Sequence, residues 1–143
     1  MGKAIIQTSI RLATQFKYEV VRPEHLFLAL IDESLRNPAD AKIILNVFKK
    51  LNVDLFSLIE DIEHSFDGPK TVSTDRRVRL SWETEKILKV SYLESEILRS
   101  EYIDVEQILL SYLRNGSAFS EEILKSKHNI TYQNVKDIIE RIN

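Results

Sequence analysis

Positions 23–31 read PEHLFLALI, and this run sets the helical character of the whole chain. Between His25 and Asp32 the run has no polar residue, so no side of a helix built from it would suit water. A helix that is apolar all round is a buried helix. Pro23 suits the first helical position, where a missing N–H is not needed. The run therefore predicts a helix inside the core.

The segments around this run are amphipathic. In the preceding segment, apolar and small residues recur on one face at 100° per residue, namely Ile5, Ile6, Ser9, Leu12, Ala13, Phe16 and Val20. Behind Asp54, a favourable N-cap residue, apolar residues step by three and four, namely Leu55, Leu58, Ile59, Ile62 and Phe66. We expect each segment to form a helix with one buried face.

The composition agrees with a helical protein. The 143 residues include 3 Gly, 3 Pro and no Cys, which disfavours turn-rich β folds and excludes disulfides and thiolate metal sites. The 20 Lys and Arg against 22 Asp and Glu give a net charge of −2, so no broad basic field is available for nucleic acid. No apolar run is long enough for a signal peptide or a membrane span, and a cytoplasmic protein is expected.

The sequence also contains a weak internal repeat. A shift of 82 residues places apolar on apolar and small on small, and the matched pairs include Ile5 and Ile87, Ser9 and Ser91, Ala13 and Ser95, Glu24 and Glu106, and Leu28 and Leu110. A shift of 77 residues places LNVD at 51–54 on HNIT at 128–131. The sequence therefore indicates one module that occurs twice.

We predict an all-α fold in which a duplicated four-helix repeat forms an eight-helix, pseudo-twofold bundle. The first repeat covers residues 2–66 and the second covers residues 81–143, with a linker at 67–80. One repeat alone is near the size at which a single core becomes marginal. The two repeats are therefore expected to form a single domain, residues 1–143.

Two weak candidates for small-ligand chemistry are rejected. The sequence GPKT at 68–71 lacks a Gly directly before the Lys and the upstream Gly of a phosphate-binding loop. Glu60 and His64 have a spacing that can hold zinc, but a third and a fourth ligand are not evident. We predict no catalytic residues, no metal site and no cofactor.

The linker is locally basic, with Lys70, Arg76, Arg77 and Arg79 against Asp75. Such a segment could attract an acidic partner or nucleic acid. No aromatic residues are interleaved with these charges, as a surface for stacking bases would need. A solvated connector is therefore favoured over a nucleic-acid site.

The starts of the two most apolar helices are more informative. They read VRPEHL at 21–26 and IDVEQI at 103–108, and each places a glutamate, Glu24 or Glu106, in the first helical turn. The helix dipole favours a negative charge there by about 0.3 to 1 kcal/mol, so capping alone can explain both residues. Two equivalent carboxylates on a pseudo-symmetric pair would also make a receptor for two cationic groups. Both interpretations stay open.

At these residues the sequence resembles the N-terminal domain of the Clp AAA+ unfoldases, and most closely its ClpC-type branch. The resemblance is carried by the doubled helix, EHLFLALI at 24–31 and EQILLSYL at 106–113. The segments LSWETEKIL at 80–88 and LNVD at 51–54 also resemble that family. The resemblance spans nearly the whole chain.

The resemblance implies a non-catalytic accessory domain that docks adaptor proteins and unfolded or tagged client proteins for the AAA+ ring of the parent protein. In the ClpC-type branch, the glutamates that match Glu24 and Glu106 are implicated in holding arginine-phosphorylated clients. The groove between the starts of the two repeats, which would include Leu80 and Lys89, resembles a ligand-docking surface of that branch. Neither nucleic acid nor membrane is an implied partner.

The chain departs from the family pattern next to both glutamates. Pro23 lacks a backbone N–H, and Asp104 adds a negative charge, so both act against binding a phosphate group. The recognition of phosphoarginine is therefore left open, whereas docking of adaptors or clients is expected. The alternative function is a stand-alone helical protein-binding module that is not attached to an ATPase ring.

Overall fold

In the computed structural model of the chain, the apolar run lies inside α2 (Pro23–Arg36), and all residues at positions 23–31 are buried. The structure describes residues 2–66, 78–97, 105–115 and 120–142. Arg22 precedes α2 with extended backbone, and Pro23 occupies the start of the helix. The backbone N–H of Asn37 donates to the carbonyl of Glu33 and closes the other end. The predicted buried helix is confirmed.

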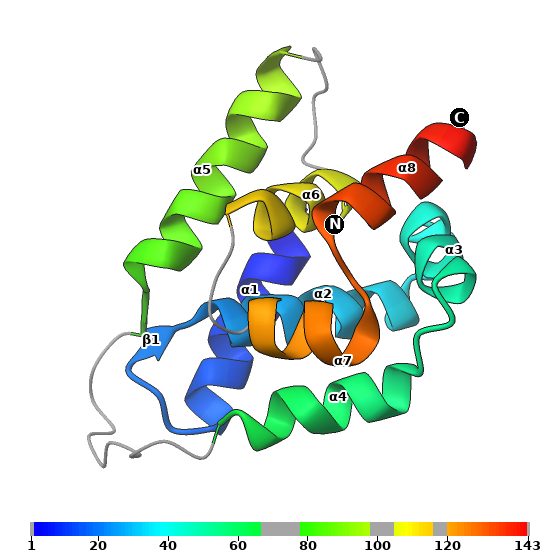
Figure 1. The fold of residues 1–143 in the computed structure, drawn as a ribbon. Coiled ribbons are helices and arrows are strands. Elements are labelled where there is room, and N and C mark those ends of the chain that lie inside the picture. Colours follow the sequence, from blue (N-terminus) through cyan, green and yellow to red (C-terminus); the bar gives the residue numbers. More distant parts are fainter. Residues whose placement is uncertain (1, 67–77, 98–104, 116–119, 143) are drawn as a thin grey trace.

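Eight α-helices, one π-helical segment and two short strands make up the described part of the chain. In order they are α1 (Gly2–Gln15), β1 (Val20–Val21), α2, α3 (Lys42–Lys50), α4 (Leu55–His64), β2 (Arg79–Leu80), α5 (Trp82–Ile97), α6 (Val105–Asn115), η1 (Ser120–Lys125), α7 (Ser126–His128) and α8 (Tyr132–Ile142) (Figure 1). The predicted all-α fold is confirmed.

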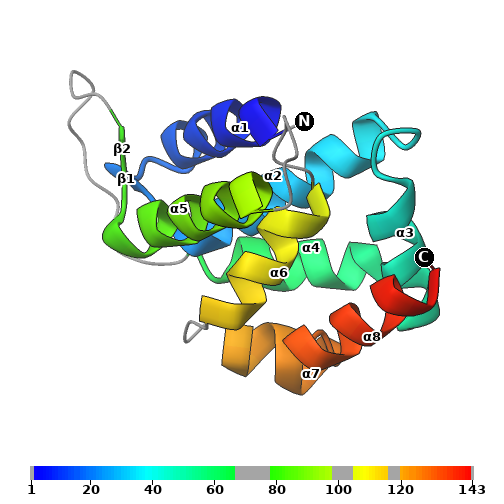
Figure 2. The same ribbon diagram turned by 90° about the horizontal axis from the view of Figure 1, so that it is seen from above.

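The helices α2 and α6 lie at the centre of the fold, and the others surround them (Figures 1 and 2). In each half the first helix packs on the second, α1 on α2 and α5 on α6. Contacts also cross between the halves, because α2 touches α5 and α6, and α3 touches α6 and α8. The two halves therefore share their central layer.

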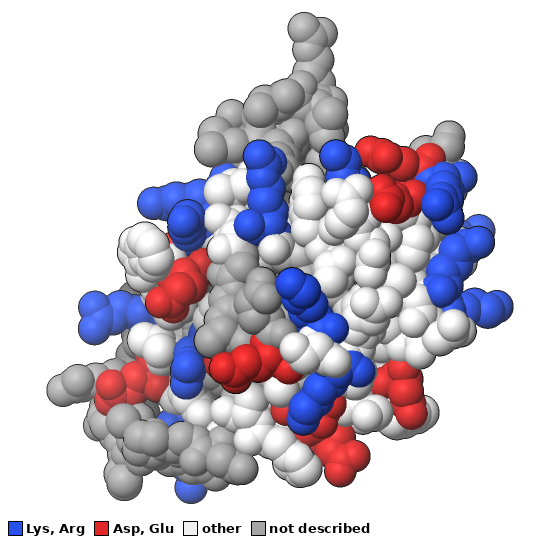
Figure 3. All heavy atoms as spheres, in the orientation of Figure 1, with Lys and Arg blue, Asp and Glu red and all other residues white. Residues whose placement is uncertain are grey.

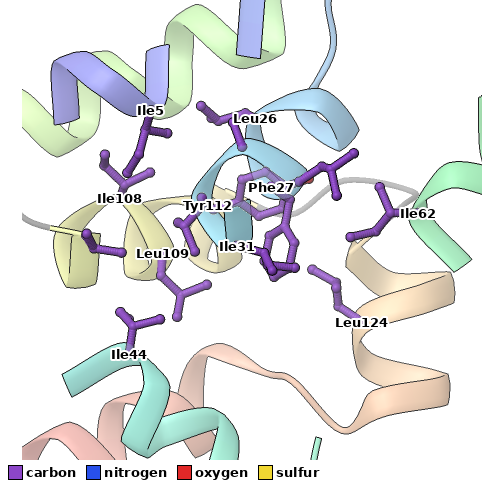
Figure 4. Packing of buried hydrophobic residues seen from close by; sticks show 14 of the residues in the cluster. Ile5, Leu26, Phe27, Ile31, Ile44, Ile62, Ile108, Leu109, Tyr112 and Leu124 are labelled. Atoms are coloured by element: carbon purple, nitrogen blue, oxygen red, sulfur yellow. The ribbon is translucent and has the colours of Figure 1, made fainter. Parts of the chain in front are cut away.

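The hydrophobic core draws on both halves in the same way (Figure 4). Phe27 of α2 faces Tyr112 of α6, with 5.2 Å between the ring centroids. The buried residues around this pair come from α1, α3, α4, α6 and η1, and they include Ile5, Ile44, Ile62, Ile108, Leu109 and Leu124. Neither half could bury these side chains alone, so the chain folds around one core.

Two turns support the duplication that the sequence predicts. Asn52 and Asn129, which the 77-residue shift pairs, both have a φ of 56°, in the left-handed region that Asn tolerates better than most residues. Asp54 then accepts hydrogen bonds from two N–H groups of α4, and Thr131 accepts one from the N–H of Asn134. The same backbone turn and the same capping role thus recur. The repeat boundaries themselves remain a prediction.

The helix α1 ends earlier than the apolar pattern predicts. Lys17 has a φ of 64°, and the N–H of Tyr18 donates to the carbonyl of Ala13 at 2.8 Å, which closes the C-terminus of the helix. Val20 was expected on the buried helical face, but it lies in β1 and is 36% exposed. That expectation is wrong because the chain leaves the helical path three residues before Val20.

The second half differs from the first in two further places. Where the first half has the single helix α3, the second has η1 followed directly by the short α7. A π-helix carries i→i+5 hydrogen bonds and is rare outside such single turns. Leu110, which the 82-residue shift matches to the buried Leu28, is half-buried.

The position of α2 in the core predicts a large difference between two leucines of that helix. Leu28→Ala should lower the free energy of unfolding by about 2 to 5 kcal/mol, because Leu28 is 6% exposed and its removal leaves a cavity. Leu35→Ala, the same change at a site that is 48% exposed, should cost less than about 1 kcal/mol. Urea unfolding measures both values, and similar losses would contradict the assigned face of α2.

Candidate functional site

The short parallel sheet brings the starts of α2 and α5 together (Figures 1 and 2). β1 pairs with β2 so that Val21 lies opposite Leu80. The N–H of Ser81 donates to the carbonyl of Val21 at 2.9 Å, and the N–H of Arg79 donates to that of Glu19 at 3.2 Å. We call the region formed by residues 19–26 and 79–86 the α2/α5 junction.

A buried threonine fixes the junction from the α5 side. The hydroxyl of Thr84 donates to the carbonyl of Val21 at 2.8 Å, so this carbonyl accepts two hydrogen bonds from the second half of the chain. The N–H of Thr84 in turn donates to the hydroxyl of Ser81 at 3.2 Å, which satisfies one of the free N–H groups at the start of α5. The two helix starts are therefore held in a fixed relation.

The start of α2 has its own set of backbone hydrogen bonds. The N–H of Arg22 donates to Nδ1 of His25 at 3.0 Å. The carbonyl of Arg22 accepts from the N–H groups of His25 and Leu26, at 3.0 and 3.2 Å. Pro23 has no N–H to offer. The N–H and the carbonyl of Arg22 are thus both bonded within this turn, and the ring of His25 replaces the Glu or Gln of an ordinary capping box.

Glu24 is the acidic residue of this turn, and its side chain is only 9% exposed. Its carboxylate oxygen Oε2 lies 3.2 Å from Nε of Arg22, whose side chain is 47% exposed. Burial raises the pKa of the Glu24 carboxyl above 4.5; Arg22 and the backbone N–H of Glu24 oppose this rise, and the charge of Glu83 adds to it. The α2/α5 junction therefore holds the desolvated carboxylate of Glu24, whose pKa the charge of Glu83 raises further.

The structure brings two of the four candidate residues together. Glu24 and Leu80 both lie in the α2/α5 junction, where Leu80 is half-buried and packs against the core. Lys89 is exposed on α5, about two helical turns beyond Trp82 and outside the junction. Glu106 is in the first turn of α6, and in both views of Figures 1 and 2 that helix begins well away from the start of α2. Glu106 therefore belongs to a separate place on the surface.

The junction also carries exposed apolar side chains that sequence reasoning missed. Trp82, the one Trp of the sequence, is 70% exposed at the start of α5, and Val20 is exposed in β1. Nζ of Lys86 lies 5.4 Å from the centroid of the Trp82 ring. Trp82 has polar neighbours at 81 and 83–86, and at 100° per residue it lies on the side of the helix opposite Ile87 and Ser91, which is a signal in the sequence that marks it as a surface residue.

His25 is a core histidine, with none of its surface exposed. Its ring stacks on Phe66, with 4.5 Å between the centroids, and meets the edge of Tyr18 at 4.8 Å. Burial, followed by the charge of Arg22, lowers the pKa of His25 to about 4. The neutral ring can then accept the hydrogen bond from Arg22, which a protonated ring could not do.

The other two histidines, His64 and His128, lie on α4 and α7. Glu60 and His64 are both exposed on α4, and Nε2 of His128 lies 2.7 Å from Oδ2 of Asp61, which joins α7 to α4. Among the residues that the structure describes, no group of three or more His, Asp or Glu side chains is arranged to hold a metal ion. GPKT at 68–71 and most of the basic linker lie outside the described residues.

The described residues on the face shown in Figure 3 form no broad basic patch. On the face shown in Figure 3, Lys and Arg are interspersed with Asp and Glu, in agreement with the net charge of −2. A protein that binds nucleic acid through phosphates needs its cations gathered on one face. None of the helices in the described part of the chain is long and apolar enough to cross a membrane.

Comparison with protein families finds a match over most of the chain. The family described as Clp repeat (R) N-terminal domain matches residues 2–127. No curated protein sequence matches the chain.

Solved structures with the same fold include the N-terminal domain of Hsp104 from Candida albicans, which is 15% identical with a TM-score of 0.78 over 99% of this chain and 87% of that one. A protein from a study of a malarial protein secretion system is 19% identical, with a TM-score of 0.73 over 96% and 88% of the two chains. The N-terminal domain of the ClpV1 ATPase from E. coli is 13% identical, with a TM-score of 0.63 over 94% and 78%.

The burial of His25 predicts a loss of stability in mild acid. The folded state holds His25 neutral down to about pH 4, whereas the unfolded chain protonates it below about pH 6.5. The unfolded state therefore binds more protons between these values, and the free energy of unfolding should fall by up to about 3 kcal/mol as the pH drops from 6.5 to 4.

His25→Gln is the matched control, because Gln can accept the same hydrogen bond without titrating and the shifted sequence has Gln107 at this position. Urea unfolding at several pH values should show a smaller acid loss in the variant than in the wild type. Parallel curves would contradict the assignment of a neutral His25.

Proposed function

We propose a docking function for this chain, and the premise is its family: the chain belongs to the Clp repeat (R) N-terminal domain family. As an accessory domain of a Clp-type AAA+ ATPase, it binds adaptor proteins and unfolded or tagged clients and presents them to the ring. It catalyses no reaction itself. We assign it to the ClpC type on the resemblance at 24–31 and 80–88, and the proposed location is the cytoplasm.

The observation that carries this proposal is the buried carboxylate of Glu24 at a junction with exposed apolar side chains. A carboxyl group whose pKa is raised by burial makes the folded state less stable at neutral pH, and such groups concentrate at functional sites. Trp82 is of the residue type that dominates the binding energy of many interfaces. The α2/α5 junction thus combines a charged anchor with an apolar contact.

The remaining candidates have different parts in this proposal. Leu80 has a structural part at the α2/α5 junction. It is half-buried and packs against the core, and its strand β2 pairs with β1, which precedes α2. Lys89 extends the surface along α5, seven residues beyond Trp82 and so on nearly the same side of the helix. Glu106 is proposed as an anchor for a second contact at the start of α6.

Glu24→Gln should separate binding from stability. At pH 7 the change removes a carboxylate that burial disfavours, so the free energy of unfolding should equal or exceed that of the wild type. Binding of an unfolded, alkylated client protein, measured by fluorescence anisotropy, should weaken about tenfold because a charged hydrogen bond is lost.

Glu60→Gln is the control for net charge, because Glu60 is exposed on α4 outside the junction. It should leave both binding and stability unchanged. Unaltered client binding by Glu24→Gln would reduce Glu24 to a helix-capping residue.

A fusion experiment tests the attachment to an ATPase ring against the stand-alone alternative. Residues 1–143 are fused to the ring of a ClpC-type protein whose own N-terminal domain is deleted. The fusion should restore adaptor-dependent unfolding of a fluorescent client, and the fusion with Glu24→Gln should restore less. Client binding by the isolated chain with no rescue in the fusion would favour the stand-alone module.

A further inference from the structure

We infer that a second surface of this chain, at the far end of α2, binds an acidic side chain of a partner protein through two arginines that share one carboxylate. The surface consists of Arg11 of α1 and of Asp32, Leu35 and Arg36 of α2, and we call it the α1/α2 face. Asp32 lies eight residues beyond Glu24 on α2, so this face is separate from the α2/α5 junction. The inference rests on the proposed function in one respect, that the bound molecule is a protein.

The two arginines come from different helices and converge on one atom. Nη2 of Arg11 lies 3.6 Å from Oδ2 of Asp32, and Nε of Arg36 lies 3.1 Å from the same oxygen. The helices are fixed beside this point, because the hydroxyl of Thr8 on α1 donates to Oε1 of Glu33 on α2 at 2.6 Å in a buried contact. The two guanidiniums are therefore held side by side before a ligand arrives, which lowers the entropy lost on binding.

The hydrogen-bond donors of both arginines are still free for a ligand. Oδ2 of Asp32 is shielded from water, yet it accepts no hydrogen bond from the described residues, so both contacts to it are ion pairs without an aligned N–H. Within the described ranges, neither guanidinium donates a hydrogen bond to another group. Each guanidinium has five N–H donors in a planar fork. The Arg11 and Arg36 side chains are 53% and 62% exposed, so a ligand can reach these donors.

The charge of the α1/α2 face suits one carboxylate. Two guanidiniums and the carboxylate of Asp32 leave a single positive charge. The neighbouring carboxylate of Glu33 is buried and accepts the hydrogen bond of Thr8, so it does not neutralise the arginines. The two oxygens of a carboxylate match the fork of a guanidinium. The helix dipole favours a cation such as Arg36 at the end of α2, but it does not account for Arg11 on another helix.

An exposed leucine next to the arginines points to a protein partner. Leu35 follows Asp32 by three positions, so it is a neighbour of Asp32 on the surface of the helix, and it is 48% exposed. A nucleic acid would need cations spread over a wider surface than one net charge. A protein segment that carries a glutamate or aspartate beside an apolar side chain matches both the charge and the leucine.

Two fluorescein-labelled, leucine-containing peptides that differ at one position, glutamate or glutamine, test the inference. Wild-type protein should bind the glutamate peptide about tenfold more tightly in fluorescence anisotropy, since a charged hydrogen bond is gained. The NMR signals of the Nε–H groups of Arg11 and Arg36 should shift with the glutamate peptide and stay in place with the glutamine peptide. Unlabelled duplex DNA should not displace the glutamate peptide.

Variants of the α1/α2 face locate the contact. Arg11→Gln and Arg36→Gln should each reduce the preference for glutamate, and both should fold as the wild type does because exposed ion pairs contribute little to stability. Arg36→Lys keeps the charge without the planar fork and should bind the glutamate peptide about threefold more weakly. Leu35→Ala should weaken both peptides equally. Lys49→Gln, at an exposed site on α3, is the control for net charge and should change neither affinity.

The outcomes separate this inference from the proposed function. Equal binding of the two peptides by the wild type, displacement by DNA, or an unreduced glutamate preference in Arg11→Gln and Arg36→Gln overturns the inference. Wild-type affinity in Arg36→Lys overturns the bidentate contact. None of these results alters the test of the α2/α5 junction, which is client binding by Glu24→Gln. If instead Glu24→Gln leaves client binding unchanged, the proposed site at the junction fails, while the glutamate preference at the α1/α2 face is measured independently of it.

Discussion

A helix with nine successive buried residues at its start cannot be covered by one neighbour, and the burial of α2 governs the rest of the structure. Helices of both halves must close around it, because α1, α4, α5 and α6 all contact it. The same burial extends to the first turn, where it removes Glu24 and His25 from water. The core and the candidate site are therefore consequences of one constraint.

In the proposed docking function, the binding surface is the junction between α2 and α5, and the same constraint shapes it. The carbonyl of Val21 accepts hydrogen bonds from Ser81 and Thr84, so the two helix starts cannot move apart without breaking buried bonds. A carboxylate fixed in this way is already desolvated and oriented before a partner arrives. Pre-organisation of this kind improves affinity by lowering the entropy lost on binding.

Much of the fold could be predicted from the sequence. Helical periodicity is a local signal, and the 77-residue shift compares two short segments that each form a turn. The shift paired Asn52 with Asn129, and both adopt the same left-handed turn. The two-residue strands could not be predicted, since they are too short for any alternation to appear. The exposure of Trp82 agrees with the helical period, because the buried Ile87 and Ser91 lie on the opposite side of α5, but its place at the same junction as Glu24 depends on the pairing of β1 with β2. The family resemblance assigns Glu24 and Leu80 to one docking surface. The parallel pairing of β1 with β2 is the physical reason why the two residues lie at the same junction.

The account depends on the Glu24 carboxyl being a buried group at the α2/α5 junction. Its pKa in the intact chain, measured by carbon-13 NMR of the side-chain carboxyl, tests this directly. We predict a pKa above 4.5, because burial disfavours the charged form. A pKa at or below 4.5 would contradict the account.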